Sequence, residues 1–214
     1  MPKKKSSLCD RNTGRDRQRF LSSEKLASGP KKRKRAEMSD YIITYTGKRF
    51  YPLRPEIEAI DVCDIARALS LMTRANGHLP HFYSVGQHCV NCVREAKARN
   101  YSKRVQLGCL LHDASEAYLS DITRPVKQYL SNYKEFESGL QNKIFERFGL
   151  AGLTEAELHL IFLIDDTILQ HEFLTLKGMP VFETDLPVYS VPDTLERIFS
   201  EVEAEFLSLY QALK

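Results

Sequence analysis

Long apolar runs are missing from this 214-residue sequence, and none approaches the roughly 20 residues that a membrane-spanning helix needs. No apolar segment follows the basic N-terminus, so a secretory signal peptide is not expected. The five cysteines are odd in number and do not suggest a disulfide framework, which suits a reducing compartment. We therefore expect a cytoplasmic protein without a membrane partner.

No internal repeat is visible either, and the 43% apolar and 28% charged residues are ordinary for a globular domain. Most of the positive charge lies in residues 1–40, which hold 13 Lys and Arg against 5 Asp and Glu, a net charge of +8. The rest of the chain holds 18 basic and 23 acidic residues, so the net charge of +3 conceals a domain of −5. The basicity therefore belongs to the N-terminal segment alone.

Residues 1–37 have few apolar positions and no helical period, and we expect a disordered basic tail because such a segment cannot offset its ordering entropy. Its PKKRKR stretch, residues 30–35, has two interpretations. It can bind a nuclear import receptor or a nucleic-acid backbone, which would make the protein nuclear, or it is a plain solvated tail. Met38 offers an alternative start.

Residues 38–214 are expected to form one domain, all-α with a small N-terminal β-hairpin. In YIITYTGKRFYPL, β-forming residues flank Gly47–Lys48, which predicts the hairpin. Asp61 and Ser84 are expected N-caps, and Phe136 is expected to face the core. Helical spacing of apolar residues predicts helices over residues 61–72, 84–100, 102–119, 134–148, 154–177 and 193–213.

Four polar residues lie on helix faces that should be dry: His88, His112, Asp113 and Asp165. Buried charge is costly unless it is paired or binds a metal. Two imidazoles and two carboxylates form a mixed N/O set that suits one divalent transition metal such as Mn, Fe, Co, Ni or Zn. Because adjacent helical positions point about 100° apart, His112 and Asp113 can converge only on an ion that lies across the helix face.

Glu116 follows on the same face as His112 and Asp113. It is placed either to handle a proton from water at a metal or to orient His88 or His112. The cysteines of Cys89-x-x-Cys92 are expected to be small core residues, because no second such pair exists.

Three segments, HFYSVGQHC, LLHDASEAYLSDITRPVK and FLIDDTIL, resemble in this order the motifs of HD-domain metal-dependent phosphohydrolases. The closest branch is similar to the 5′-deoxynucleotidases, with the phage dATP triphosphohydrolases as near relatives. The resemblance covers about residues 41–177 and implies an HD-domain helical bundle. It leaves the basic tail and the last helix unexplained.

The resemblance implies metal ligation by His88, His112, Asp113 and Asp165, with Asp166 as the competing last ligand. It further implies that Glu116 is the catalytic acid or base and that Asp121 faces the nucleotide sugar or the attacking water. Arg74 matches an arginine that holds the substrate phosphate. Further substrate contacts are expected from His78, His81 and Arg124, each of which has a plain alternative as a loop cap or solvated side chain. Departures from the family are Gly86–Gln87 before His88, and Ala75 where an aromatic residue often stacks on the nucleoside.

We expect metal-dependent hydrolysis of deoxynucleotide phosphate esters, with 5′-deoxynucleoside monophosphates as substrates. One alternative is a dATP-type triphosphohydrolase, for which Mg is a candidate metal; otherwise Co, Mn or Zn is expected. Another alternative is a non-catalytic nucleic-acid-binding or nuclear accessory protein that uses the basic tail. We also expect a homo-oligomer.

Overall fold

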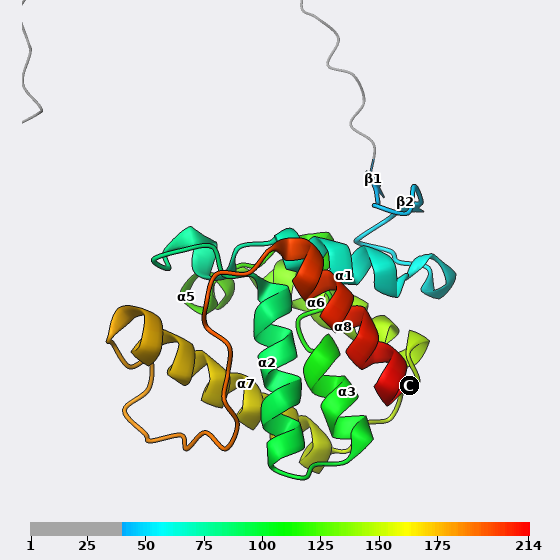
Figure 1. Cartoon of the computed structure of the whole chain (residues 1–214). Coiled ribbons are helices and arrows are strands. Elements are labelled where there is room, and N and C mark those ends of the chain that lie inside the picture. Colours follow the sequence, from blue (N-terminus) through cyan, green and yellow to red (C-terminus); the bar gives the residue numbers. More distant parts are fainter. Residues whose placement is uncertain (1–39) are drawn as a thin grey trace, which may run out of the picture. The chain divides into compact units, whose positions relative to one another are not determined.

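The computed structural model describes residues 40–214, which are mostly helical and carry one small antiparallel hairpin near their N-terminal end (Figure 1). The expected disordered tail, residues 1–37, and its PKKRKR segment lie outside the described residues. None of the helices within residues 40–214 is both long and apolar enough to cross a membrane.

The hairpin forms where the sequence predicts it. Strand β1 (Ile42–Ile43) pairs with β2 (Arg49–Phe50), with Ile42 opposite Phe50. The turn between them uses Gly47 at φ 83°, a left-handed conformation that glycine adopts without steric cost. Phe50 is buried and stacks on the Tyr118 ring at 3.9 Å between centroids, which attaches the hairpin to the helical core.

Eight α-helices and two 3₁₀ helices follow the hairpin within the described part of the chain. They are η1 (Ile57–Ala59), α1 (Val62–Leu71), η2 (Arg74–Gly77), α2 (Val85–Ala98), α3 (Lys103–Leu111), α4 (Glu116–Leu119), α5 (Arg124–Lys127), α6 (Ser131–Arg147), α7 (Glu155–Lys177) and α8 (Phe199–Leu213).

Local capping explains several helix starts. The side chains of Asp61, Ser84 and Ser102 accept hydrogen bonds from backbone N–H groups in the first turns of α1, α2 and α3. Helix α7 begins with a capping box between Thr154 and Glu157, in which each side chain accepts from the other residue's backbone N–H. The expected N-caps Asp61 and Ser84 are confirmed.

Helix α2 lies at the centre of the packing and contacts α1, α3, α7 and α8 (Figure 1). A cluster of buried apolar residues joins α2, α3 and α7: Cys92, Ala96, Val105, Cys109, Ile161, Ile164 and Ile168. Gly108 lets α3 pack on Ile161 of α7, because a Cβ there would lie 2.3 Å from Cδ1 of Ile161 and force this side chain to move. This packing sets α2, α3 and α7 side by side.

Three sequence expectations are wrong in detail. The helix expected over residues 102–119 ends at Leu111, and a tight turn precedes α4. Phe136 is 37% exposed and does not face the core. The last helix begins at Phe199, not at Asp193 or Thr194. The first break has a physical cause: the side-chain amide of Gln141 donates to Leu111 O (2.7 Å) and accepts from the backbone N–H of Ser115 (3.1 Å), so it satisfies backbone groups that a continuous helix would pair internally.

Candidate metal centre

Packing of α2, α3 and α7 brings the four expected ligands together. His88 lies on α2 and is fully buried, and Asp165 lies on α7 with its side chain 13% exposed. His112 and Asp113 lie in the turn between α3 and α4. His112 keeps helical backbone angles in this turn, and Oδ2 of Asp113 lies 3.3 Å from Nε2 of His112, so both side chains face the same point.

The distances between their donor atoms fit a shared cation. Oδ1 of Asp165 lies 3.1 Å from Nε2 of His88 and 3.7 Å from Nε2 of His112, and Oδ2 of Asp113 lies 3.3 Å from Nε2 of His112. Metal–nitrogen and metal–oxygen bonds of about 2.0–2.2 Å place neighbouring ligand atoms about 2.8–3.6 Å apart in tetrahedral or octahedral shells. The two imidazole rings are 5.3 Å apart between centroids, which leaves room for one ion between them.

Hydrogen bonds at the other ring nitrogen orient each histidine. Nδ1 of His112 lies 2.8 Å from Cys109 O, an acceptor, so this nitrogen carries a proton and Nε2 is the nitrogen that can bind a metal. Nδ1 of His88 lies 2.7 Å from Oε1 of Glu172. Nε2 of each histidine therefore faces the carboxylates, and Nε2 of His112 is buried without a hydrogen-bond partner among the described residues. A cation between the imidazoles and the carboxylates would bind both sets of ligand atoms.

The charges of the cluster show the same need for a cation. Burial alone would lower the pKa of His112, but the neighbouring charge of Asp113 raises it well above its ordinary value. Burial would raise the pKa of Asp165, but the neighbouring imidazoles of His112 and His88 hold it well below its ordinary value. The carboxylates of Asp113 and Asp165 therefore stay ionised, with the His112 imidazolium beside them. A divalent ion can replace the second proton of His112.

Arg74 lies at the inner wall of the site. Its side chain is 10% exposed; Nε donates to Oε2 of Glu172 (3.0 Å), while Nη1 and Nη2 lie 3.5 Å from Asp113 and 3.6 Å from Asp165. The next residue, Ala75, has φ 52°, a left-handed conformation that costs a non-glycine residue energy and is concentrated at functional sites. The guanidinium is therefore held beside the ligand carboxylates by a strained loop.

Glu116 begins α4 beside the cluster. One carboxylate oxygen lies 3.7 Å from Nζ of Lys127, and the other, Oε2, is buried without a hydrogen-bond partner among the described residues. Burial raises the pKa of Glu116 above its ordinary value, and the charges of Asp113 and Asp121 raise it further. Burial also raises the pKa of Asp121. Glu116, which holds a proton, thus lies next to the two carboxylates of Asp113 and Asp165, which do not.

A cavity of about 1020 Å³ opens onto the cluster. Its walls come from one face of α6 and one face of α7, and its floor from the turn that holds His112 and Asp113. The expected residues Arg74, His78, His112, Asp113, Glu116, Asp121, Arg124 and Asp165 all line it. His88 lies behind this wall, fully buried.

Of the remaining expected contact residues, Arg124 and His78 line the cavity and His81 does not. Arg124 donates to Asp165 (2.6 Å) and Asp166 (2.7 Å). His78 is exposed at the cavity rim. His81 is not brought to the cavity: its Nε2 lies 2.9 Å from Thr194 O, and the lining formed by the described residues does not include it.

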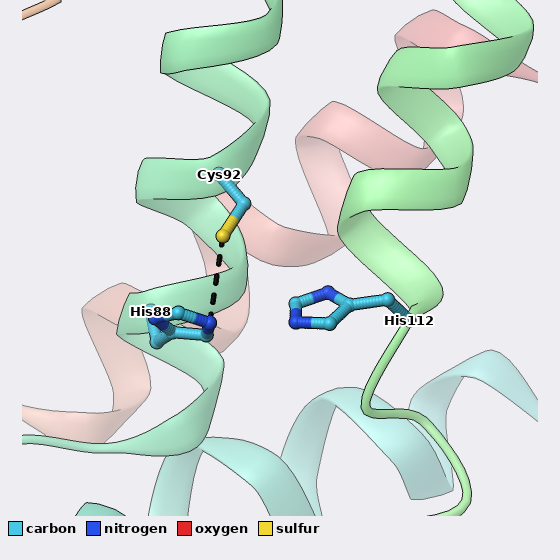
Figure 2. A group of neighbouring side chains, drawn as sticks. All are labelled: His88, Cys92 and His112. Atoms are coloured by element: carbon cyan, nitrogen blue, oxygen red, sulfur yellow. Dashed lines mark hydrogen bonds between the residues drawn. The ribbon is translucent and has the colours of Figure 1, made fainter. Parts of the chain in front are cut away.

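Cysteines lie on the inner side of the same centre. The Sγ of Cys92 is 3.5 Å from Nε2 of His88, one helical turn away on α2 (Figure 2). His88, Cys92 and His112 form a group that could hold a metal ion, and so do Cys89, His112 and Asp113. Both thiols are buried, as the sequence predicts, and burial raises the pKa of Cys89 and lifts that of Cys92 well above its ordinary value. The two thiols are competing ligands to the carboxylates of Asp113 and Asp165.

The expected set omits three residues that shape the site: Glu172, Tyr83 and Gln141. Glu172 is fully buried and accepts from His88, from Tyr83 OH (2.8 Å) and from Arg74. Its signal in the sequence is its position seven residues after Asp165, two turns along the same face of α7. Tyr83 and Gln141 carry no local signal, because their partners lie far away in the sequence.

Comparison with known proteins gives no name for an activity. No family model matches the chain. It is 40% identical over 110 residues to "Uncharacterized protein YfdR" of Escherichia coli K12, a match that covers 51% of this chain and 59% of the relative. It is 33% identical over 129 residues to "Uncharacterized protein RCAP_rcc00048" of Rhodobacter capsulatus, covering 58% of this chain and 65% of the relative. The chain thus spans less than two thirds of the length of these curated relatives.

Proposed function

We propose that this protein is a metal-dependent phosphohydrolase that removes phosphate from 5′-deoxynucleoside monophosphates. One observation carries the proposal: where a large cavity opens, Oδ1 of Asp165 lies 3.1 Å from Nε2 of His88 and 3.7 Å from Nε2 of His112, and Oδ2 of Asp113 lies 3.3 Å from Nε2 of His112. When bound, a divalent ion such as Mn, Co or Zn would lower the pKa of nearby water and offset charge on a phosphate ester. The donor set of nitrogen and carboxylate oxygen suits these ions.

Glu116 is the residue to move the proton. Its raised pKa and unpaired Oε2 let it hold a proton near the ester oxygen and exchange it with water. Asp121, on the same side of the cavity, lies within reach of the sugar or the attacking water. Arg74 and Arg124 present guanidinium groups to a phosphate that approaches the carboxylate pair.

The cavity lining supports a nucleoside with a single phosphate. Its volume is at the top of the range of about 300–1000 Å³ typical of small-molecule sites, which leaves room for a base and a sugar. Apolar side chains from α6 and α7 offer a wall for the base: Phe145, Leu158, Phe162, Leu169 and Phe173. The lining includes six acidic and three basic side chains, an imbalance that disfavours a triphosphate. The dATP-type triphosphohydrolase, with Mg, is the alternative.

Turnover of a panel of deoxynucleoside mono- and triphosphates with added Mn, Co, Zn or Mg tests the proposal. We expect inorganic phosphate from the monophosphates, and release of tripolyphosphate from dATP would select the alternative. Asp165→Asn should abolish metal binding and turnover while the helices persist, and Asp166→Asn, its matched control, should change both little. Metal-independent turnover or no turnover of any nucleotide would reject the proposal.

The non-catalytic nucleic-acid-binding alternative depends on the basic segment, which lies outside residues 40–214. No contact in the described part of the chain favours it over the enzyme. The homo-oligomer remains a prediction.

A further inference from the structure

Glu172 connects the candidate metal centre to a second set of buried polar groups. Besides His88 and Arg74, its carboxylate accepts from the hydroxyl of Tyr83, whose side chain is fully buried. The single hydroxyl proton of Tyr83 is used in this bond. The hydroxyl oxygen must therefore accept from its other neighbour, Nδ2 of Asn91, at 2.8 Å.

Asn91 continues the connection to the segment between α7 and α8. Its Nδ2 also donates to Asp193 O (2.8 Å), and its Oδ1 accepts from Asp193 N (3.0 Å). Gln87, one turn earlier on α2, donates to Asp193 O and Leu195 O, both at 2.9 Å. Figure 1 shows this segment running beside α2. We call residues 187–195 the strap.

We propose that Tyr83 and Asn91 are positioning residues that link the strap to the ring of His88 through Glu172. The path is continuous: His88 Nδ1 to Glu172 Oε1 (2.7 Å), Glu172 to Tyr83 OH, Tyr83 to Asn91, and Asn91 to Asp193. The inference rests on the proposed metal centre, because its consequence is the geometry of a metal ligand.

The physical role of this path is to fix which nitrogen of His88 is free. Glu172 keeps the proton on Nδ1 only while its own carboxylate is held in place, and Tyr83 supplies one of the three hydrogen bonds that hold it. Partners that orient a metal-bound histidine typically contribute 10–100-fold to metal affinity or activity. Loss of the Tyr83 hydroxyl lets the Glu172 carboxylate rotate. The neutral His88 ring then also populates the tautomer with its proton on Nε2.

Tyr83→Phe is the direct test, because it removes the hydroxyl and keeps the ring. We expect Mn²⁺ affinity, measured by calorimetry, to fall about 10-fold or more. In the metal-free protein, at a pH high enough to make the ring of His88 neutral, we expect its ¹⁵N NMR signals to change from a mostly Nδ1–H form to a mixture of tautomers. Tyr210→Phe is the matched control: Tyr210 lies against Phe148, away from the path, and should change neither value.

The two measurements separate this inference from the proposed function. If the wild-type protein binds no metal, the proposed function fails, whereas the tautomer measurement still decides the role of Tyr83. Unchanged affinity and an unchanged tautomer in a folded Tyr83→Phe protein would overturn the inference. If that variant does not fold, Asn91→Ser replaces it, with a smaller loss of affinity and the same tautomer shift expected; no shift there would also overturn the inference.

Discussion

Arg124 donates from Nη2 to Oδ2 of Asp165 over 2.6 Å, although its side chain is 53% exposed. The pairing occupies the oxygen of Asp165 that does not face His88, and Nη1 of the same guanidinium pairs with Asp166. An exposed ion pair contributes little to stability, typically about 0–1 kcal/mol. Because Arg124 lines the cavity, its substitution should affect substrate binding more than the stability of the fold.

Arg124→Ala should raise KM for a deoxynucleoside monophosphate about tenfold and leave kcat nearly unchanged. The reason is that a charge-assisted contact to phosphate is lost equally in the ground state and the transition state. Metal affinity should not fall, because a positive charge next to Asp165 is removed. Steady-state kinetics and calorimetry measure the three values. Arg104→Ala is the control, since Arg104 pairs with Glu157 outside the cavity lining. A fall in kcat with an unchanged KM would mean that Arg124 stabilises the transition state and not the bound substrate.

Cys92→Ser should leave Co²⁺ binding intact, and the spectra of both proteins should lack a thiolate-to-cobalt charge-transfer band. The thiol lies near both histidines but is fully buried outside the cavity lining, whereas Asp113 and Asp165 line the cavity through which an ion would enter. Cys109→Ser controls for the loss of another buried thiol. A charge-transfer band that disappears only in Cys92→Ser would place sulfur among the ligands.

Glu116→Gln should keep metal and nucleotide affinity while kcat falls by about 10²–10⁴-fold, the range typical of general acid–base catalysis. The amide keeps the shape of the side chain but cannot carry the transferred proton. If Glu116 instead orients His88 or His112, the variant should bind metal more weakly and recover turnover in excess metal. A metal titration of turnover in wild type and variant distinguishes the two roles.

Local patterns predict much of the fold because their causes are local. Asp61 and Ser84 each cap a helix through a bond to a residue two or three positions ahead, and Gly47 permits the turn in the hairpin. These interactions lie within a few residues, so the sequence displays both partners side by side. The all-α class and the hairpin follow from such signals.

The errors arise where a distant residue decides the local conformation. The helix break after Leu111 depends on Gln141, 30 residues away, whose side-chain amide donates a hydrogen bond to the backbone O of Leu111. The late start of α8 depends on Asn91, which binds the backbone of Asp193 across 102 residues. Neither contact leaves a periodic signal in the sequence.

In the candidate site, too, the sequence predicts some residues and misses those whose partners are distant. The ligand set follows from polar residues at apolar helical positions and from the family resemblance. The groups that orient it do not, since Tyr83 reaches Glu172 across 89 residues.

Glu95 makes the stability of the protein depend on acid pH. It is fully buried on α2 and accepts hydrogen bonds from Arg99 and from Tyr189 and Ser190 of the strap. Burial alone would raise its pKa, but the bonds from Ser190 and Arg99 hold it below the ordinary value of 4.5. The unfolded chain therefore binds this proton more tightly than the folded protein. The stabilisation is present above pH 4.5 and is lost as the pH falls below 4.5 through the folded-state pKa.

Glu95→Gln should therefore destabilise the protein by about 2 kcal/mol at pH 7, because hydrogen bonds to a charged group are lost and an amide N–H meets other donors. The difference from wild type should shrink steadily as the pH falls below 4.5, where the wild-type carboxylate takes up its proton. Urea unfolding at a series of pH values measures both free energies. Glu135→Gln, an exposed position on α6, should show neither effect. A Glu95→Gln penalty that is constant from pH 7 to pH 3 would mean that the shape of the side chain, and not its charge, holds the strap against α2.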